Sequence, residues 1–272
     1  MVDWVDFYQI DAFTDKPFKG NPAAIFIMPT DMSEDLYLAI SREMNLSETA
    51  FLENTGRGTY RLRWFTPTQE VPLCGHATLA AAYLLFNHHR VKQERIRFDT
   101  KSGPLFAENV SEGVLMNFPS NPPHRVDPPM QILEALGVEG WIDVQYSPGN
   151  QKLMIHLKSH ESLLNVSPDF TALKEAKNSL GWRATMITAS GFNDYDFVSR
   201  HFAPLMGVNE DPATGSNHTV LTPYWGNLLD KRRMRAYQAS RRGGSIIVED
   251  LGERVNLIGR CVLVLKGKMQ IG

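Results

Sequence analysis

The sequence has little of what marks several large classes of protein. Its 272 residues include only two cysteines, Cys74 and Cys261, too few and too far apart to form the disulfide framework of a secreted domain. Basic residues number 28 and acidic residues 30, a near balance that gives no long-range attraction to nucleic acid or an anionic membrane. The longest apolar runs, 77–86 and 261–265, are much shorter than the roughly 20 residues that cross a bilayer. We therefore expect a soluble protein with buried thiols and neither a membrane nor a nucleic-acid partner.

Known motifs for nucleotides, metals and export are also missing. The chain contains no P-loop, no G-x-G-x-x-G fingerprint, and no H-E-x-x-H or Cys-x-x-Cys spacing. Residues 1–6 carry acidic side chains where a secretory signal needs basic ones. The sequence thus predicts a cytoplasmic protein that uses neither a cofactor nor a metal.

One cluster of charge departs from the overall balance. It contains Lys231, Arg232, Arg233, Arg235, Arg241 and Arg242. Such a cluster could contact nucleic-acid phosphates, which would make the protein a binding module rather than an enzyme. No zinc finger, helix-turn-helix or aromatic platform accompanies it, so a solvated helix end or an anion-binding turn is the favoured interpretation.

Short strands alternate with a few helices along the chain. Apolar patterning and turn residues predict strands within 7–27 and 49–65, at 95–99 and 113–118, and near 145, 153–157 and 186–189. Helices are predicted at 33–44, 131–136 and 170–180. The segment 76–88 is different because it is apolar on nearly all sides. A helix with one face exposed to solvent would carry polar residues on that face, so this helix is expected to be buried all round. The simplest arrangement wraps a curved sheet around this helix.

A short pattern occurs twice. Arg63-Trp-Phe-Thr-Pro67 matches Arg200-His-Phe-Ala-Pro204, and each is followed by a glycine, Gly75 or Gly215, that opens an apolar helix. The repeat predicts two related domains, with chance similarity as the alternative.

Prolines suggest where these domains meet. Residues 119–129 include five prolines, which disfavour both a helix and a central strand. We therefore expect a first domain at 1–120, a linker at 121–129 and a second domain at 130–256.

A glycine at the start of a buried helix lets backbone amides approach a ligand, and the unpaired N–H groups and helix dipole favour an anion there. A single copy would more simply be a tight turn, but two copies favour a pair of carboxylate-binding ends. His76 and Ser216 follow the two glycines and would point toward such a ligand, with helix capping as the alternative. Asp211, beside Pro212, is a candidate polar group or a plain turn residue.

Glu48 lies between a predicted helix and the apolar strand 49–52. Burial would raise its pKa and allow one carboxyl group to take a proton from carbon and return it elsewhere near neutral pH. An ordinary exposed glutamate is the alternative, and composition does not decide between them. Cys74 could be a nucleophile at a helix N-terminus, but no Cys/His/Asn order accompanies it, so inert burial is favoured.

Six motifs together resemble the phenazine-biosynthesis PhzF-like family in order and spacing. They are Asp11-Ala-Phe-Thr14, Gly20-Asn-Pro-Ala23, Ser47-Glu-Thr-Ala-Phe51, Arg63-Trp-Phe-Thr-Pro67, Cys74-Gly-His-Ala-Thr78 and Asp211-Pro-Ala-Thr-Gly-Ser216. The resemblance covers nearly the whole chain.

The resemblance implies an α+β fold like that of diaminopimelate epimerase. It implies two similar domains related by a pseudo-two-fold axis, each a β-barrel or roll wrapped around a central helix, with the active site in the cleft between them. In such a fold the C-terminal strand returns to the first domain, which 257–272 would then complete. A homodimer is also expected from the relatives.

The resemblance further implies roles for individual residues. It makes Glu48 the acid/base group, supported by His76, Asp211 and Ser216. The implied substrate-binding residues are Asn21, Gly75, Ala77, Thr214, Gly215 and Asn217. The stretch 238–244 resembles a late substrate-side loop, in which either Arg241 or Arg242 would face the substrate.

A departure from the related epimerases narrows the expected chemistry. Those enzymes use two cysteines, whereas here only Cys74 matches and Thr214 occupies the second place. The expected function is a cofactor-independent isomerase that moves a proton on a small carboxylate-bearing metabolite. A non-catalytic metabolite- or protein-binding relative on the same scaffold is the alternative.

Overall fold

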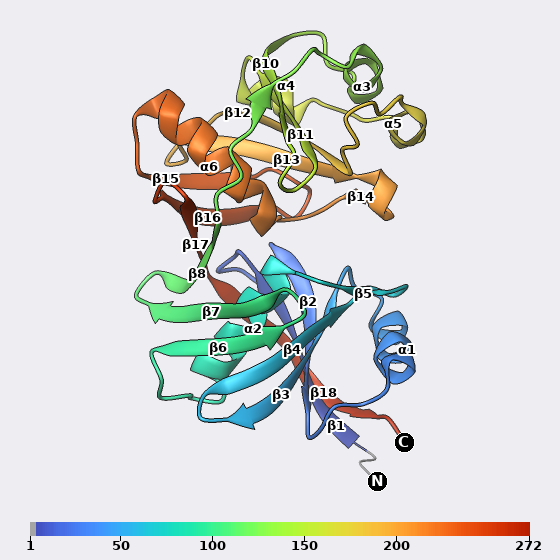
Figure 1. Ribbon diagram of the computed structural model, residues 1–272, viewed down its shortest axis with the longest axis vertical. Helices are drawn as coiled ribbons and strands as arrows, with labels where there is room; N and C mark the ends of the chain where they lie inside the picture. Colours follow the sequence, from blue (N-terminus) through green and yellow to red (C-terminus); the bar gives the residue numbers. More distant parts are fainter. Residues whose placement is uncertain (1–3) are drawn as a thin grey trace. The chain divides into compact units, whose positions relative to one another are not determined.

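The computed structural model describes residues 4–272, which form two compact units. Unit 1 runs to Asn117 and includes Leu257–Gly272, and unit 2 comprises Phe118–Asn256. Strands predominate over helices in both, so the fold is α+β (Figure 1). No helix within 4–272 combines the length and the hydropathy needed to span a bilayer.

The sheet of unit 1 is built largely from neighbouring antiparallel strands. Its strands are β1 (Trp4–Ala12), β2 (Asn21–Met28), β3 (Thr49–Gly56), β4 (Thr59–Phe65), β5 (Glu70–Val71), β6 (Arg95–Thr100), β7 (Gly103–Val110), β8 (Gly113–Pro119) and β18 (Cys261–Gln270). Two pairs are parallel, β2 with β3 and β4 with β6. Because β18 pairs with β1, the C-terminal segment returns to the first strand of the unit.

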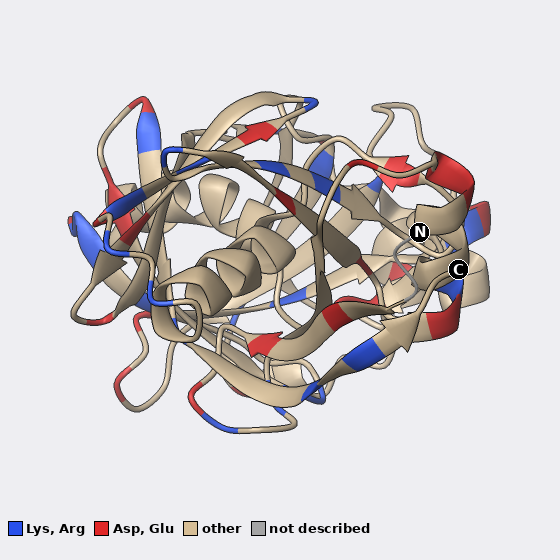
Figure 2. Cartoon of the chain, turned by 90° about the horizontal axis from the view of Figure 1, so that it is seen from below, with Lys and Arg blue, Asp and Glu red and all other residues tan. Residues whose placement is uncertain are grey.

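Helix α2 (Gly75–Asn87) is the centre of unit 1. It contacts β1, β2, β3, β7 and β18, and ten of its 13 residues are buried. It carries no charged side chain, and the helices inside the strands are tan in Figure 2, the colour of residues other than Lys, Arg, Asp and Glu. The all-round apolar pattern of 76–88 therefore reflects a helix enclosed by its own sheet.

Helix α1 (Glu34–Met44) packs elsewhere on the same sheet. Tyr37 and Ile40 join a cluster with Phe26, Phe51 and Phe65. The Ser33 hydroxyl accepts from the Leu36 amide at 3.3 Å and caps the helix, which ends at Asn45 in the left-handed conformation.

Unit 2 repeats this order of elements. Its strands are β9 (His124–Arg125), β10 (Trp141–Ser147), β11 (Lys152–Leu157), β12 (Ala184–Ser190), β13 (Phe197–Ala203), β14 (Val208–Glu210), β15 (Arg233–Gln238), β16 (Gly244–Asp250) and β17 (Arg254–Gly259), the last running on into unit 1. Parallel pairs again occur at corresponding places, β11 with β12 and β13 with β15. Within the proline-rich stretch 119–129, β9 pairs with β10 and so belongs to this sheet.

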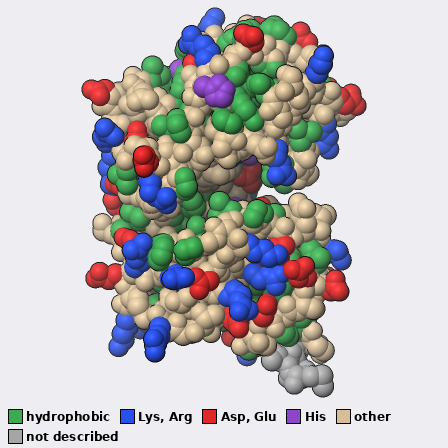
Figure 3. Space-filling model, viewed as in Figure 1, with side chains coloured by type: hydrophobic (Ala, Val, Ile, Leu, Met, Phe, Trp, Pro, Cys, Tyr) green, Lys and Arg blue, Asp and Glu red, His purple; other side chains and the backbone are tan. Residues whose placement is uncertain are grey.

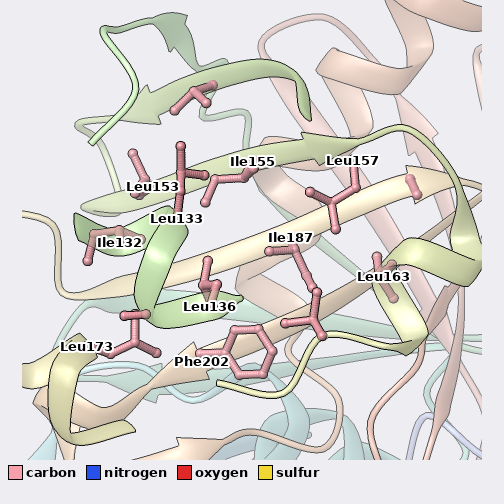
Figure 4. Packing of buried hydrophobic residues seen from close by; sticks show 14 of the residues in the cluster. Ile132, Leu133, Leu136, Leu153, Ile155, Leu157, Leu163, Leu173, Ile187 and Phe202 are labelled. Carbon is pink, nitrogen blue, oxygen red and sulfur yellow. The ribbon is translucent and has the colours of Figure 1, made fainter. Parts of the chain in front are cut away.

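Helix α6 (Gly215–Leu229) corresponds to α2, contacts β15 and β16, and also lacks charged residues. Three shorter helices cover the sheet elsewhere: α3 (Met130–Leu136), α4 (His160–Leu164) and α5 (Phe170–Glu175). Figure 4 shows the apolar cluster beneath them, where Leu133 and Leu173 gather near Ile187 and Phe202. One short 3₁₀ helix, η1 (Pro204–Met206), follows β13.

The helix predicted at 170–180 is too long. Helix α5 ends at Glu175, because Ala176 is extended and the chain then turns. The Asn178 side chain holds that turn by accepting from the Trp182 amide at 3.0 Å and donating to its carbonyl.

The molecular surface carries charges of both signs, intermixed on the face seen in Figure 3. Within the basic cluster of 231–242, Lys231 pairs with Asp196 and Arg233 pairs with Glu249. These ion pairs neutralise part of the cluster locally.

We expect Gly113→Ala to destabilise unit 1 strongly. Gly113 has φ 142°, and an added Cβ would lie 2.3 Å from the carbonyl oxygen of Gly259, in the segment that leads to β18. Gly103→Ala is the matched control, since Gly103 has φ 92° but open space around it. The control should cost about 1–2 kcal/mol from backbone strain, and Gly113→Ala about 1–3 kcal/mol more from the clash. Urea unfolding measures both, and equal losses would contradict the close approach.

Candidate active site

Three of the predicted residues, Asn21, Glu48 and His76, meet at the start of α2 in unit 1, together with Cys74. The carboxylate Oε2 of Glu48 lies 3.5 Å from Nε2 of His76. On the other edge of the ring, Nδ1 of His76 lies 3.3 Å from the Asn21 amide nitrogen and 3.5 Å from the Cys74 sulfur. Because Asn21 donates to Nδ1, the neutral imidazole carries its proton on Nε2, which faces Glu48. Glu48 keeps 22% of its side chain exposed, whereas His76 keeps 7%.

The loop before β2 fixes the position of Asn21. Asp11 is buried, and its carboxylate accepts from the Phe18 amide at 2.7 Å, which closes the loop. Gly20 has φ 63°, and a Cβ there would lie 2.1 Å from the carbonyl oxygen of Ala12. Only glycine fits this approach, which explains the Gly-Asn pair of the second motif.

The first turn of α2 presents backbone amides beside His76. The hydroxyl and amide of Thr78 both donate to the Cys74 carbonyl, at 2.6 and 3.2 Å. The amides of Gly75 and Ala77 are among the first-turn groups that have no intrahelical acceptor. They make this end of the helix suited to an anion.

Glu48, Cys74 and His76 also form a set of metal-ligand types. One donor atom from each lies within 4.8 Å of the others. Carboxylate oxygen, thiolate and imidazole are ligands that Zn²⁺ accepts. The sequence spacing gave no sign of this grouping, because Glu48 comes from a different element.

A second cluster forms in unit 2 at the start of α6. The Thr214 hydroxyl donates to the Asp211 carboxylate, and the Thr214 amide donates to Gln238 Oε1 at 2.8 Å. The Gln238 amide nitrogen donates to the Asp211 carbonyl at 2.6 Å. Gln238 is fully buried and therefore fixes the loop before the helix. In the sequence, Gln238 is distinguished only as the start of the 238–244 stretch.

Lysine 152 is the site residue that sequence analysis missed. Lys152 Nζ lies 2.7 Å from the Ser216 hydroxyl and 2.7 Å from Asn217 Oδ1, and the residue is 6% exposed. Burial lowers the pKa of Lys152 to about 7, although the negative charge of Asp211 acts to raise it. A lysine opening the otherwise apolar stretch of β11 was the available signal.

The repeated R-x-F-x-P pattern has a structural cause. Arg63 makes a bidentate pair with Glu70, at 2.9 and 2.8 Å, and stacks over Phe65 at 5.1 Å. In both units the glutamate precedes the helix-opening glycine by five residues.

Arg200 repeats this arrangement in unit 2. It pairs with Glu210 at 2.8 and 3.1 Å and stacks over Phe202 at 5.0 Å. The pattern therefore anchors each segment that leads into a central helix.

The predicted site residues thus form one group in each unit. Unit 1 contains Asn21, Glu48, Gly75, His76 and Ala77, and unit 2 contains Asp211, Thr214, Gly215, Ser216 and Asn217. Arg241 is exposed and Arg242 is half-buried. Both cysteines are free thiols, and burial raises the pKa of Cys261 strongly.

The repeated α+β units and their enclosed helices give the chain a diaminopimelate epimerase-like fold. A structure of a predicted epimerase from Pseudomonas aeruginosa matches with a TM-score of 0.73 over 97% of this chain and 99% of that chain. The sequence identity is 21%, so this likeness concerns the fold alone.

The chain belongs to the PhzC-PhzF family of phenazine biosynthesis-like proteins, whose model matches residues 10–267. A Pseudomonas aeruginosa protein named an uncharacterized isomerase is 43% identical, over 98% of this chain and 99% of its own length. A PhzF-family structure from Enterococcus faecalis is 40% identical, with a TM-score of 0.92 over 98% of this chain and 99% of its own. These similar proteins support isomerase activity.

Two buried histidines line the interior of unit 2. His218 on α6 donates from Nδ1 to the Thr214 carbonyl at 3.0 Å, and burial lowers its pKa to about 4. Burial also holds the pKa of His201 well below the usual value, with the Lys152 charge adding to the effect. Both imidazoles are therefore neutral in the folded protein near neutral pH.

We expect these histidines to make the protein acid-sensitive. The unfolded state takes up protons from about pH 6.5, whereas folded His218 does so only near pH 4. Stability should therefore fall as the pH drops between these values, by about 3 kcal/mol for this residue. His218→Asn, which can still donate to the carbonyl, should flatten this slope in denaturant titrations. Exposed His124→Asn is the control, and parallel slopes for both variants and the parent would argue against the effect.

Proposed function

We propose that the protein is a cofactor-independent isomerase that moves a proton between two positions of a small carboxylate-bearing metabolite, with Glu48 as the general acid/base. The observation that carries this proposal is the pairing of Glu48 with buried His76 beside an amide-rich helix start. The isomerase names of similar proteins support the reaction class.

A single carboxyl group favours a proton shift over a two-base epimerisation. Thr49 of β3 and Thr185 of β12 occupy corresponding places, opposite Phe65 and Phe202. The residue before Thr185 is Ala184, so unit 2 has no counterpart of Glu48. Thr214 also stands where a second catalytic thiol would be needed.

The proposed reaction uses Glu48 twice. As a carboxylate, it removes a proton from a carbon next to a carbonyl or double bond, and the electron pair moves into the conjugated system. It then returns the proton to a position further along the substrate. His76, with its Nε2 proton toward Glu48, would hold the carboxylate in place. The amides at the start of α2 would stabilise negative charge that develops on the substrate.

The expected homodimer and cytoplasmic location stay predictions. The site chemistry addresses two features of a substrate, a carboxylate group and an acidic carbon. A binding protein without catalysis would be stabilised thermally by such a metabolite, but it would not exchange the carbon-bound protons of the metabolite with solvent.

We expect Glu48→Gln to slow catalysis severely while keeping the fold. The amide has nearly the same shape but cannot exchange a proton with carbon, so the rate should fall by about 10²–10⁴. The measurement is proton NMR in heavy water, with metabolites first selected by thermal shift, scoring deuterium incorporated into carbon.

Glu43→Gln is the matched control, because Glu43 is exposed near the end of α1. It should incorporate deuterium at the parent rate. Undiminished exchange in Glu48→Gln would remove Glu48 from the mechanism. Thermal stabilisation of the parent protein without exchange would instead favour the binding function.

A further inference from the structure

The internal repeat separates residues that the fold requires from residues that it does not. Ala24 of β2 pairs with Thr49, and Leu153 of β11 pairs with Thr185, so these strands can be aligned residue by residue. Three positions before these residues lies the asparagine of a Gly-Asn pair, 20–21 in unit 1 and 149–150 in unit 2. The Asn150 side chain donates to the Ser216 carbonyl at 3.1 Å, at the start of α6. Recurrence of this kind shows which positions the two units share.

Lys152 has no such counterpart. The aligned residue in unit 1 is Ala23, which is fully buried. The fold therefore accepts a small apolar residue at this position, and a buried amine here costs desolvation that packing does not require. An ionisable group kept at such a cost beside predicted substrate-binding residues is a candidate for function.

The geometry gives Lys152 one specific effect. An ammonium group can only donate hydrogen bonds, so the Ser216 oxygen, 2.7 Å away, must accept from it. Asn217 Oδ1 accepts a second hydrogen bond from the ammonium at 2.7 Å, which fixes the direction of the amine. The Ser216 hydroxyl then keeps its own proton for another acceptor.

We propose that Lys152 is a positioning residue that holds the Ser216 hydroxyl as a hydrogen-bond donor to a carboxylate at the start of α6. The carboxylate rests on the proposed function, whereas the pairing of Lys152 with Ser216 does not. The ammonium also adds positive charge to the helix start, which favours an anion there.

Among the ionisable groups around it, Lys152 is the one whose protonation changes near neutral pH. Asp211, before α6, is the anion whose charge acts on it. His201 of β13 and His218 of α6 are buried and have lowered pKa values. When Lys152 loses its proton, its lone pair can accept from Ser216, and the hydroxyl is turned away from a ligand.

The test uses the full chain with ¹³C-labelled lysine and ¹⁵N-labelled backbone, titrated by NMR from about pH 5.5 to about pH 9. One lysine signal, identified by its loss in Lys152→Met, should titrate near pH 7, and the Ser216 and Asn217 amide signals should follow it. Ser216→Ala should lower that midpoint, because the ammonium loses an acceptor. Lys158→Met is the control, since Lys158 is exposed at the other end of β11.

Acetate serves as the carboxylate probe. It should shift the Ser216 and Asn217 amide signals in the parent protein and in Lys158→Met. Its affinity should fall at least about tenfold in Lys152→Met and in Ser216→Ala, with little further loss in the double variant, as expected for one coupled pair. The parent response should also weaken above the lysine midpoint.

Three results would overturn the proposal: an ordinary lysine titration for Lys152, a midpoint unaffected by Ser216→Ala, or no acetate response at the start of α6. If Lys152→Met does not fold, Lys152→Arg identifies the lysine signal by its loss, and the Ser216→Ala titration then decides the pairing. The isomerase proposal fails separately, through the deuterium assay of Glu48→Gln. That variant should keep the acetate response at Ser216.

Discussion

The structure depends on fixing where two charge-free helices begin. Each central helix is buried by its own sheet, so neither can use surface charges to set its position. A bidentate arginine–glutamate pair stacked over a phenylalanine performs this task in both units, with Arg63 and Glu70 in one and Arg200 and Glu210 in the other. The pairs are partly buried, so their geometry is specific as well as stabilising. Chemistry at the helix starts requires this placement, because acid/base and binding groups act only at fixed distances.

The two units share a scaffold and differ in their ionisable groups. In the alignment of the two units, Glu48 of unit 1 corresponds to Ala184 of unit 2, and Lys152 of unit 2 corresponds to Ala23 of unit 1. An acidic group at one helix start and a basic group at the other are therefore additions to a duplicated plan. Each addition lies on a position where a small residue suffices for folding, which is where substitution during divergence costs least stability.

Sequence patterns were most informative where local chemistry alone decides structure. The family and the α+β fold were predicted correctly, as were α1 with its Ser33 cap and the all-round apolar α2. The length of α5 was wrong, because a side-chain hydrogen bond from Asn178 competes with the helix and leaves no periodic signal. Contacts between distant segments were harder still. Lys152 reaches Ser216 across 64 positions, so nothing nearby in sequence indicated the pair.

The return of β18 to β1 has a consequence for synthesis of the chain. Strand β1 precedes unit 2 along the chain and its partner β18 follows it, so β1 is synthesised well before β18. Unit 2 lies wholly between them, so it can fold while the edge of β1 is still unpaired. An unpaired edge is a template for unwanted strand association. Unit 2 can thus be complete while unit 1 still lacks β18, and at that stage the edge of β1 is open to neighbouring chains.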